Sequence, residues 1–354
     1  MIPIIIDSDR VTKLGLIDYY SSFIWTERYY TTGDFELVVP INAQTLDLLR
    51  PGRYVMREDR DDVGIIEKIK MEVIERISDA NTRMIVSGRF LPSILGRRII
   101  AKQTIVNRRF DQNISDLFMD NARNPAEPER EIDFLSLSFG YATYPTFKQQ
   151  FTGTNLLDAI SDMCQTYGFG YRGYLDSYGG VDIRFYQGVD RTVGNAGGVD
   201  PVIFSVEYDN LSAVEYEADY SKLANAVFVA GEGEGYDRKT IWVEPTSPTG
   251  IDRFEVFKDS RNISSTTETG TLTDEEYYAQ LSESGLDSLT RVLEALAGSV
   301  DFAQVEYKTD IDVGDKCTIQ YEAWGISMNP RLLEVIESID ESGMHTFTPS
   351  FGEL

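Results

Sequence analysis

Alternating apolar and polar residues, broken by closely spaced turns, run through the first hundred residues of the chain. Phe35, Leu37 and Val39 share one face of an extended segment, and this period of two is typical of a half-buried strand. Pro40 ends that segment. About five or six such strands fit into residues 1–100 with one short helix, which indicates a small antiparallel barrel or sandwich.

A change to helical periodicity marks residues 101–210. Apolar residues recur every three or four positions after Asn113 and again before Gly168, which predicts two short helices, the second capped by Thr154 or Asn155. Two strand patterns over residues 171–186 then form a hairpin around a glycine turn. We therefore expect a small α+β domain.

Strand patterns return at residues 211–246 and again at 300–354, with a different segment between them. That segment, residues 247–299, begins rich in Ser, Thr and Gly and continues with a helix that starts at Thr273 and includes Leu296. The helical block therefore interrupts a second β domain.

The chain has 354 residues, about twice the usual size of a single domain, so we expect several domains with separate cores. The predicted fold class is mainly β with α+β parts. We divide the chain into a first β domain at 1–100, an α+β domain at 101–210, a second β domain at 211–246 and 300–354, and an inserted domain with a helix at 247–299.

Composition excludes several classes of protein. Two cysteines and one histidine are too few for a disulfide framework or for a zinc site of thiolates and imidazoles. No apolar run approaches the roughly 20 residues of a membrane-spanning helix, and the first residues lack the pattern of a signal peptide. We therefore expect no metal, no cofactor and no stable insertion into a membrane.

The net charge of −25 is distributed unevenly. Residues 50–109 carry 14 basic and 8 acidic side chains, whereas residues 201–354 carry 10 basic and 30 acidic ones. Because phosphate binding depends on clustered cations, we expect most of this surface to repel nucleic acid. The basic region is a candidate for contacting an acidic neighbour, and the alternative is that both regions are solvated surfaces.

Carboxylates alternate with other residues in two predicted strands of the acidic half, at 214–219 and 302–312. They are Glu215, Glu217 and Asp219 in the first, and Glu306, Asp310 and Asp312 in the second. Period-two spacing puts the members of each row on one face, and in the first row it places them about 6–7 Å apart, which is costly without solvent or cations nearby.

None of the apparent catalytic motifs has the context that its chemistry needs. Gly and Glu alternate over residues 231–235, but a strand follows instead of a helix, so a hairpin tip is favoured over a nucleotide loop. His345 lies between predicted strands with no nucleophile elbow to pair with it. The acidic residues within 59–62 lack the spacing of a calcium loop and predict a solvated turn. We assign no catalytic residue, and exclusion favours an assembly protein.

Segments spread over nearly the whole chain form a further pattern. They are Trp25–Tyr30, Gly33–Leu37, Leu49–Tyr54, Gly64–Glu67, Val86–Leu91, Arg97–Ile99, Asn225–Gly231, Asp312–Asp315 and Phe347–Gly352. In these segments the chain resembles siphophage tail-tip proteins, the tail-associated or baseplate hub proteins.

The resemblance implies a structural protein similar to the hub of T-even phages. Such a hub has two tube-like antiparallel β-barrels, an α+β domain between them and an inserted domain in the second barrel, and the order of domains read above agrees. Three chains form a ring of six barrels that mimics the hexameric tail tube and adapts sixfold to threefold symmetry. On this hypothesis the six carboxylates of the two rows line an acidic channel through which DNA passes without sticking.

The resemblance also implies partners and a location. The partners are two further copies of the chain, a distal tail protein or tail tube protein, the tape-measure protein, and a tip spike or receptor-binding protein, with DNA only in transit. The location is the tail tip of the virion, after assembly in the host cytoplasm. Because the chain stops two residues after Phe351 and Gly352, we expect lysis and adsorption to belong to another polypeptide.

Two rival functions stay open. One is a tail-associated endopeptidase or peptidoglycan hydrolase. The other is a glycan-binding module, since 20 tyrosines and three tryptophans could stack on sugars.

Overall fold

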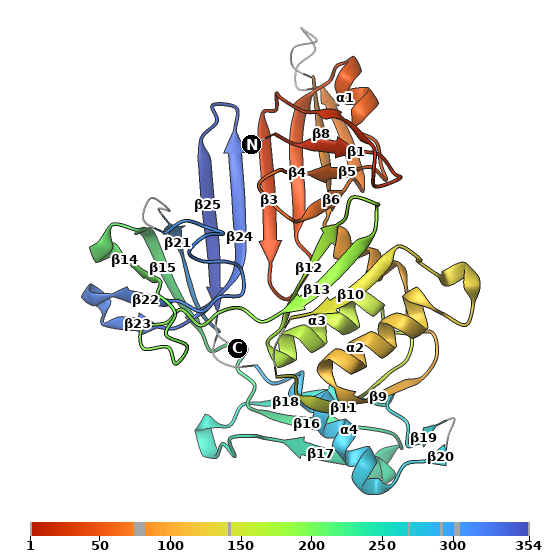
Figure 1. The fold of residues 1–354 in the computed structure, drawn as a ribbon. Coiled ribbons are helices and arrows are strands. Elements are labelled where there is room, and N and C mark those ends of the chain that lie inside the picture. The colour runs from red at the N-terminus through yellow and green to blue at the C-terminus, as the bar shows by residue number, and fades with distance from the viewer. Residues whose placement is uncertain are drawn as a thin grey trace.

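An eight-stranded antiparallel sheet dominates the computed structural model of the chain (Figure 1). The structure describes residues 2–73, 82–140, 143–267, 270–290, 293–300 and 305–352. Within them the fold is mainly β, as the sequence predicts, with several sheets and few helices. Strands from both ends of the chain meet in the large sheet, in the order β15-β21-β25-β24-β3-β4-β8-β7.

The N-terminal half of this sheet packs one apolar face against a smaller sheet. Its strands are β3 (Ser22–Arg28), β4 (Asp34–Pro40), β7 (Lys68–Val73) and β8 (Thr82–Arg89). The smaller sheet, in the order β2-β1-β5-β6, contains β1 (Ile4–Ile6), β2 (Lys13–Leu16), β5 (Tyr54–Met56) and β6 (Val63–Ile65). Phe23, Trp25 and Phe35 are buried between the two. Helix α1 (Ala43–Leu48) begins after Asn42, whose side chain accepts from Thr45 N–H.

The C-terminal half is built in the same way. Its strands are β15 (Leu211–Asp219), β21 (Leu293–Val300), β24 (Arg331–Asp340) and β25 (His345–Gly352). The smaller sheet has the order β14-β22-β23 and consists of β14 (Ile203–Ser205), β22 (Thr318–Tyr321) and β23 (Ile326–Met328). Phe204, Val335 and Phe351 belong to the core that these strands share.

The two halves have the same strand order. When the four strands of each half are numbered along the chain, both halves run first, second, fourth, third from the same side of the large sheet. The accompanying strands also pair in the same order, β1-β5-β6 and β14-β22-β23, although β1 and β5 are antiparallel and β14 and β22 parallel. The chain therefore contains a repeated β unit. The two copies share one sheet, and neither forms a separate closed barrel within the described residues.

An α+β domain lies between the two β units in sequence and packs beside the large sheet (Figure 1). Its elements are the 3₁₀ helix η2 (Leu91–Arg97), β9 (Thr104–Arg109), α2 (Phe110–Phe118), the π-helical turn η3 (Met119–Arg123), β10 (Leu135–Phe139), β11 (Thr146–Phe151), α3 (Leu156–Tyr167), β12 (Gly170–Leu175) and β13 (Val181–Tyr186). Asn155 is the cap of α3, which decides between the two predicted candidates, Thr154 and Asn155, and Gly168 ends that helix with φ of 75°. Helix α2 begins at Phe110 instead of after Asn113, because the buried Asn113 amide bonds to Arg108 N–H and C=O.

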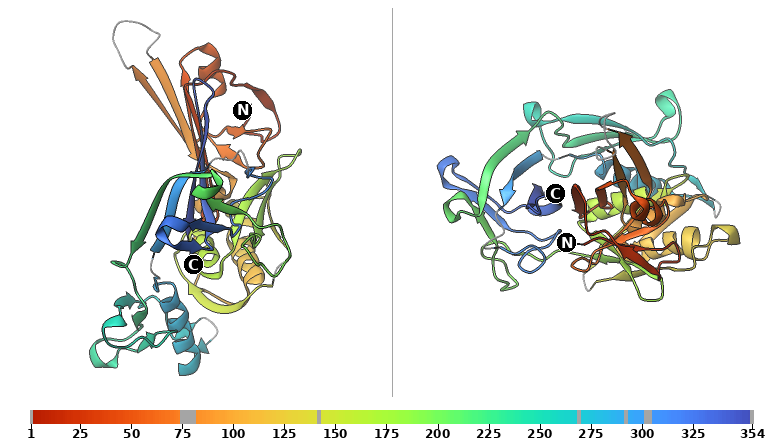
Figure 2. Two further views of the ribbon diagram at one scale, coloured as in Figure 1. Left: turned by 90° about the vertical axis from the view of Figure 1, so that its left-hand side faces the viewer. Right: turned by 90° about the horizontal axis from the view of Figure 1, so that it is seen from above.

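The inserted domain interrupts the β15–β21 hairpin. It contains β16 (Ala226–Ala230), β17 (Thr240–Val243), β18 (Glu255–Asp259), β19 (Thr266–Thr267), β20 (Gly270–Thr271) and α4 (Asp274–Leu286). Ala224 and Thr290 exchange backbone hydrogen bonds of 3.1 and 2.9 Å, so the chain enters and leaves the domain at one place. The capping box of Thr273 and Glu276 starts α4 as predicted. Figure 2 shows the domain at the opposite end of the molecule from α1.

Three sequence predictions in the second half are wrong. Leu293 and Leu296 lie in β21 and not in a helix, because this segment pairs with β15 and β25. The predicted strand 302–312 is a tight turn where it is described, with Tyr307 bridged to Ile311; residues 302–304 lie outside the described residues. Residues 226–243, placed in the second β domain, form a separate sheet in the order β17-β16-β18.

Short 3₁₀ turns connect several elements, at Pro128–Arg130, Val206–Tyr208, Gly235–Asp237, Gly250–Asp252 and Glu322–Trp324. The turn at 235–237 leads into β17, which agrees with a hairpin tip at the glycine-rich segment. In the described parts of the chain, no helix has the length and apolar character needed to cross a membrane.

Candidate functional site: a buried ionic junction

The two β units join where β3 pairs with β24, and the register places two carboxylates on the apolar face of the sheet. Trp25 lies opposite Glu337. Glu27 lies two residues from Trp25 on β3, so both carboxylates share the face of the Trp25 ring. Only 3% of Glu27 and 2% of Glu337 is exposed. Carboxylates buried to this extent need cationic partners.

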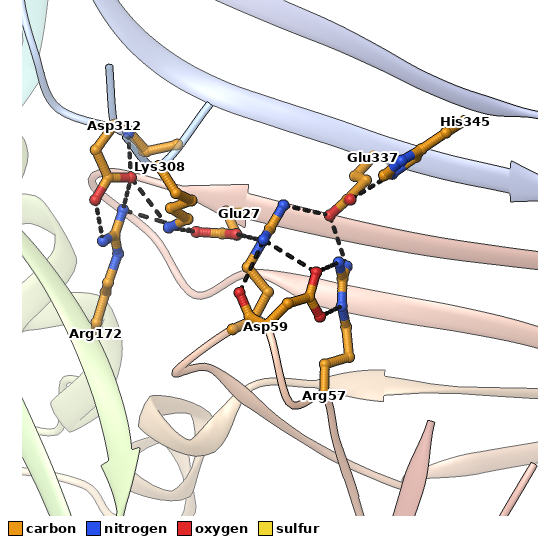
Figure 3. A network of polar contacts seen from close by, with 10 residues as sticks. Glu27, Arg57, Asp59, Arg172, Lys308, Asp312, Glu337 and His345 are labelled. Atoms are coloured by element: carbon orange, nitrogen blue, oxygen red, sulfur yellow. Dashed lines mark hydrogen bonds and ion pairs between the residues drawn. The ribbon is translucent and has the colours of Figure 1, made fainter. Parts of the chain in front are cut away.

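Arg57, just after β5, is the principal partner of Glu337 (Figure 3). Its side chain is fully buried, and its Nη1 donates to Glu337 Oε2 at 2.6 Å. Its Nη2 lies 2.6 Å from Asp59 Oδ2, and the guanidinium lies 5.4 Å from the centre of the Trp25 ring. Arg60 Nη2 donates to the same Glu337 oxygen at 3.1 Å. The first β unit therefore supplies the cations that neutralise a carboxylate of the second.

Arg172, Lys308 and Asp312 complete the network around Glu27 (Figure 3). Arg172 comes from β12 and binds Asp312 through two hydrogen bonds of 2.5 and 2.6 Å. Lys308 donates to both Glu27 and Asp312. The network therefore connects both β units and the α+β domain at a single place.

The charges of the network keep two of its carboxylates ionised. Burial opposes the charge of Glu27, but Lys308 and Arg172 outweigh burial and lower the pKa of that carboxyl. Burial likewise opposes the charge of Asp312, and the same two cations hold its pKa well below its usual range. Both carboxylates are therefore negatively charged in the folded protein near neutral pH.

Asp62 differs from Glu27 and Asp312, because its surroundings raise its pKa instead of lowering it. It is 4% exposed, and with Glu27 and Arg172 it lines a cavity of about 10 Å³, room for about one water. Burial, and then the negative charge of Glu27, raise the pKa of Asp62 to about 7, although Arg172 and Lys308 oppose the rise. The predicted solvated turn is wrong for Asp62, because the β5–β6 connection folds onto the junction.

We expect Asp62→Asn to stabilise the protein most above pH 7, by an amount that shrinks as the pH falls towards about 4. Because the folded pKa is raised, the folded state keeps a proton that the unfolded state releases above about pH 4, so wild-type stability falls as pH rises towards about 7 and stays lower beyond it. Asparagine does not ionise and removes this loss. Urea unfolding of both proteins between about pH 5 and 8.5 measures it. A difference in unfolding free energy that does not grow with pH contradicts the assignment.

On the opposite face of β3 and β24, two half-exposed ion pairs share Arg28. Arg28 Nε donates to Glu334 Oε2 at 2.6 Å across the β3–β24 pairing. Its Nη1 donates to Asp34 Oδ2 on β4 at 2.5 Å. The junction between the two β units is thus held by charges on both faces of the sheet.

The six carboxylates predicted to line a channel fall into three groups. Glu215, Glu217 and Asp219 lie on β15, where the register sets them opposite Ala297, Ala295 and Leu293 of β21. Glu306 and Asp310 are exposed in the turn before β22, and Glu306 N–H donates to Asp310 Oδ2 at 2.8 Å. Asp312 belongs to the buried network on the apolar face. The predicted row of Glu306, Asp310 and Asp312 does not exist, because no strand aligns them.

The two cysteines and the single histidine have the surroundings of structural residues. Cys164 and Cys317 are buried, and burial raises the pKa of both thiols. His345, at the start of β25, hydrogen-bonds to the Glu337 carboxylate. No group of three or more His, Cys, Asp or Glu in the described ranges could hold a metal ion. The ionic network around Glu27 and Glu337 can hold the two β units and the α+β domain together.

Solved structures of phage tail proteins have a fold similar to that of this chain. The tail protein from Neisseria meningitidis MC58 has a TM-score of 0.61 at 14% identity, over 99% of this chain and 96% of that one. The 43 kDa tail protein of prophage MuSo2 from Shewanella oneidensis has 0.59 at 12%, over 99% and 98%. Prophage tail protein gp18 from Listeria monocytogenes EGD-e has 0.56 at 12%, over 100% and 95%. At these identities the likeness is one of fold.

The chain belongs to the family of Siphovirus ReqiPepy6 Gp37-like proteins, whose sequence profile matches residues 4–353. No curated protein sequence matches the chain. The resemblance to siphophage tail proteins is therefore confirmed at the level of family and of fold.

Sequence reasoning missed the ionic junction, although one signal for it exists. Glu27 continues the face that begins with Phe23 and Trp25, and Glu337 lies between Val335 and Ile339 on the face that those residues bury. A carboxylate at a strand position whose neighbours two residues away are buried and apolar predicts a buried ion pair. The identity of the cations could not be found in this way, because Arg57, Arg172 and Lys308 lie on three distant parts of the chain.

Proposed function

We propose that the chain is the structural hub at the distal tip of a phage tail, where three copies form a ring that closes or continues the tail tube. The observation that supports this proposal is the repeated β unit, with equal strand order in both halves of the large sheet. Two units in each of three chains make six equivalent positions, as in a hexameric tube, on an assembly of threefold symmetry. Such a ring adapts sixfold to threefold symmetry and anchors a tip spike or fibre during DNA delivery.

The two edges of the large sheet favour closure of this ring. Its outer strands are β7 and β15, and edge strands present main-chain groups that can pair with another chain. β7 carries Lys68 and Lys70, whereas β15 carries Glu215, Glu217 and Asp219. We propose that β7 of one copy pairs with β15 of the next, so that opposite charges meet at each contact.

In such a ring the face of the sheet opposite the apolar core lines the channel. The cross-strand row that starts at Glu215 on β15 continues through Ala297, Ser350 and Glu334 to Arg28. We propose that Glu215, Glu217 and Asp219 make this lining acidic, which prevents DNA from binding during passage. Glu306 and Asp310 are weaker candidates, and Asp312 is excluded by its pairing with Arg172.

The domains take separate roles in this proposal. The two β units form the ring, the α+β domain braces it, and the inserted domain between Ala224 and Thr290 lies outside it. The proposed partners are the distal tail protein or tail tube protein, the tape-measure protein, and a tip spike or receptor-binding protein. The proposed location is the tail tip of the virion, after assembly in the host cytoplasm.

We expect Lys68→Glu combined with Lys70→Glu to abolish trimer formation while the monomer stays folded. Both lysines are exposed on the edge strand, so the change does not disturb the core, but it brings like charges against β15 of the neighbouring copy. Solution mass from light scattering, for the free chain and for the chain docked on tail tube, measures the effect. Lys13→Glu, on another exposed strand end, is the matched control.

A wild-type protein that forms a stable dimer, or a double variant that still forms trimers, contradicts the ring. The rival function, a tail-associated endopeptidase or peptidoglycan hydrolase, predicts that the purified chain cleaves cell-wall preparations. Cleavage that survives the double variant would support the rival, because that activity does not depend on the ring.

A further inference from the structure

Strand β10 is an edge of its sheet and presents unpaired main-chain groups. The sheet order is β10-β13-β12, so within the described chain only β13 pairs with β10. At the two ends of β10, hydrogen bonds of 2.8 Å to β13 use Phe134 C=O and Gly140 N–H. Main-chain groups alternate in direction along a strand, so the even-numbered residues face β13. The N–H and C=O groups of Leu137 and Phe139 therefore point to the open edge.

This edge lacks the features that usually protect a sheet. Proteins guard exposed edges with charged side chains, prolines, bulges or a covering element. The sequence of β10 is Leu-Ser-Leu-Ser-Phe, without charge or proline, and its register with β13 runs without a shift. By contrast, the edge strand β7 carries Lys68, Lys70 and Glu72. An unguarded edge is a template for a further strand.

A groove of about 450 Å³ runs beside the edge. Phe118 and Met119 form its helical wall, and Leu135 and Leu137 form the wall on β10. Met119 is 42% exposed and begins the π-helical turn η3, in which α2 ends. Turns of this kind occur often at functional sites, because they turn side chains away from the regular helical direction. The open edge and the apolar groove thus lie side by side.

We propose that the β10 edge binds an extended segment of another tail protein, which adds a strand to the sheet and places alternate apolar side chains in the groove. The hydrogen bonds come from the outward main-chain groups of Leu137 and Phe139, and the groove selects the side chains. A strand inserted here has one face towards Phe118 and Met119 and the other towards solvent. The segment is therefore one with apolar residues at every second position.

The chemistry of the edge argues against other occupants. A helix satisfies its main-chain groups internally and cannot pair with those of β10. A small molecule in the groove leaves most of the row of donors and acceptors unpaired. A second copy of the chain could pair two β10 edges, but the proposed ring already uses β7 and β15, and pairing at β10 would join rings to one another.

The test uses the full chain and synthetic peptides of about 12 residues, long enough to span one strand, tiled across the other proteins of purified tails. We expect at least one peptide with an alternating apolar pattern to bind the wild-type chain. Leu137→Pro removes the outward N–H without touching the bonds to β13, and we expect it to weaken binding by about tenfold, the effect of a lost hydrogen bond. Amide exchange over residues 135–139 is expected to slow when the peptide binds.

Met119→Glu is a second test, which can be used if the Leu137→Pro variant does not fold. Met119 is an exposed residue of the groove, so its replacement leaves the core unchanged. We expect it to weaken binding at least as much, because a carboxylate replaces the apolar wall. Leu46→Glu on α1, with an exposed fraction of 43%, is the matched control and should bind as wild type. The proposal is overturned if no tiled peptide binds, if binding survives Met119→Glu, if a bound peptide protects other amides only, or if the edge instead mediates self-association that Met119→Glu abolishes.

Discussion

Replacing Arg57 with Ala is expected to lower the free energy of unfolding by about 3–5 kcal/mol. The substitution leaves Glu337 buried with less of its compensating charge, and it also removes the guanidinium from the Trp25 ring. Because the pair joins two β units that are distant in sequence, the loss should appear as separation of the halves as well as lower stability. Chemical denaturation of the purified chain, followed by tryptophan fluorescence, measures the effect.

Arg50→Ala is the matched control for this prediction. Arg50 lies in the same β unit and pairs with Asp47, but its side chain is 58% exposed. An exposed pair of this kind contributes little, so we expect a change within about 0.5 kcal/mol. A loss below about 1 kcal/mol for Arg57→Ala would show that the junction is not a principal source of stability.

Gly88→Ala is expected to destabilise the protein by at least about 3 kcal/mol and to reduce its soluble yield. A Cβ at this position of β8 would lie 1.7 Å from Ile65 C=O and 3.0 Å from Glu67 N. Both are main-chain atoms, so relief requires the smaller sheet to move away from the large one. Gly88 is thus the place where the two sheets of the first β unit touch, and thermal unfolding of the variant measures the cost.

Gly197→Ala serves as the control for the glycine substitution. The nearest atoms to an added Cβ there are Val199 Cγ2 at 3.6 Å and Asn195 Oδ1 at 3.7 Å, which are ordinary contacts. We expect this variant to unfold close to the wild-type temperature. Equal stability of the Gly88 and Gly197 variants would contradict the close approach of β6 and β8.

Local signals predict several elements of this fold because the chemistry that fixes them is local. Asn155 bonds to the first turn of α3, and Thr273 exchanges hydrogen bonds with Glu276 at the start of α4, so sequence alone identifies both helix starts. Leu293 and Leu296 fail this reasoning. Their spacing is that of a helix, but pairing with strands from two other parts of the chain decides their conformation.

The joining of the two β units also lies beyond local signals. The sequence indicates two separate β domains, yet β3 pairs with β24 through seven residue pairs, from Ser22 with Asp340 to Arg28 with Glu334. Both strands have the alternation of any half-buried strand, and nothing in that pattern names a partner. For the same reason Glu27 and Glu337 can be recognised as buried acids, while the cations that neutralise them cannot.

The hydrogen-bonded pair Ala224–Thr290 gives the inserted domain adjacent entry and exit points on neighbouring strands. A unit attached in this way can be lengthened, removed or exchanged by recombination at a single position, because a short turn between the same two residues would preserve the β15–β21 hairpin. The inserted domain can therefore change in length or content while the framework of the two β units stays the same.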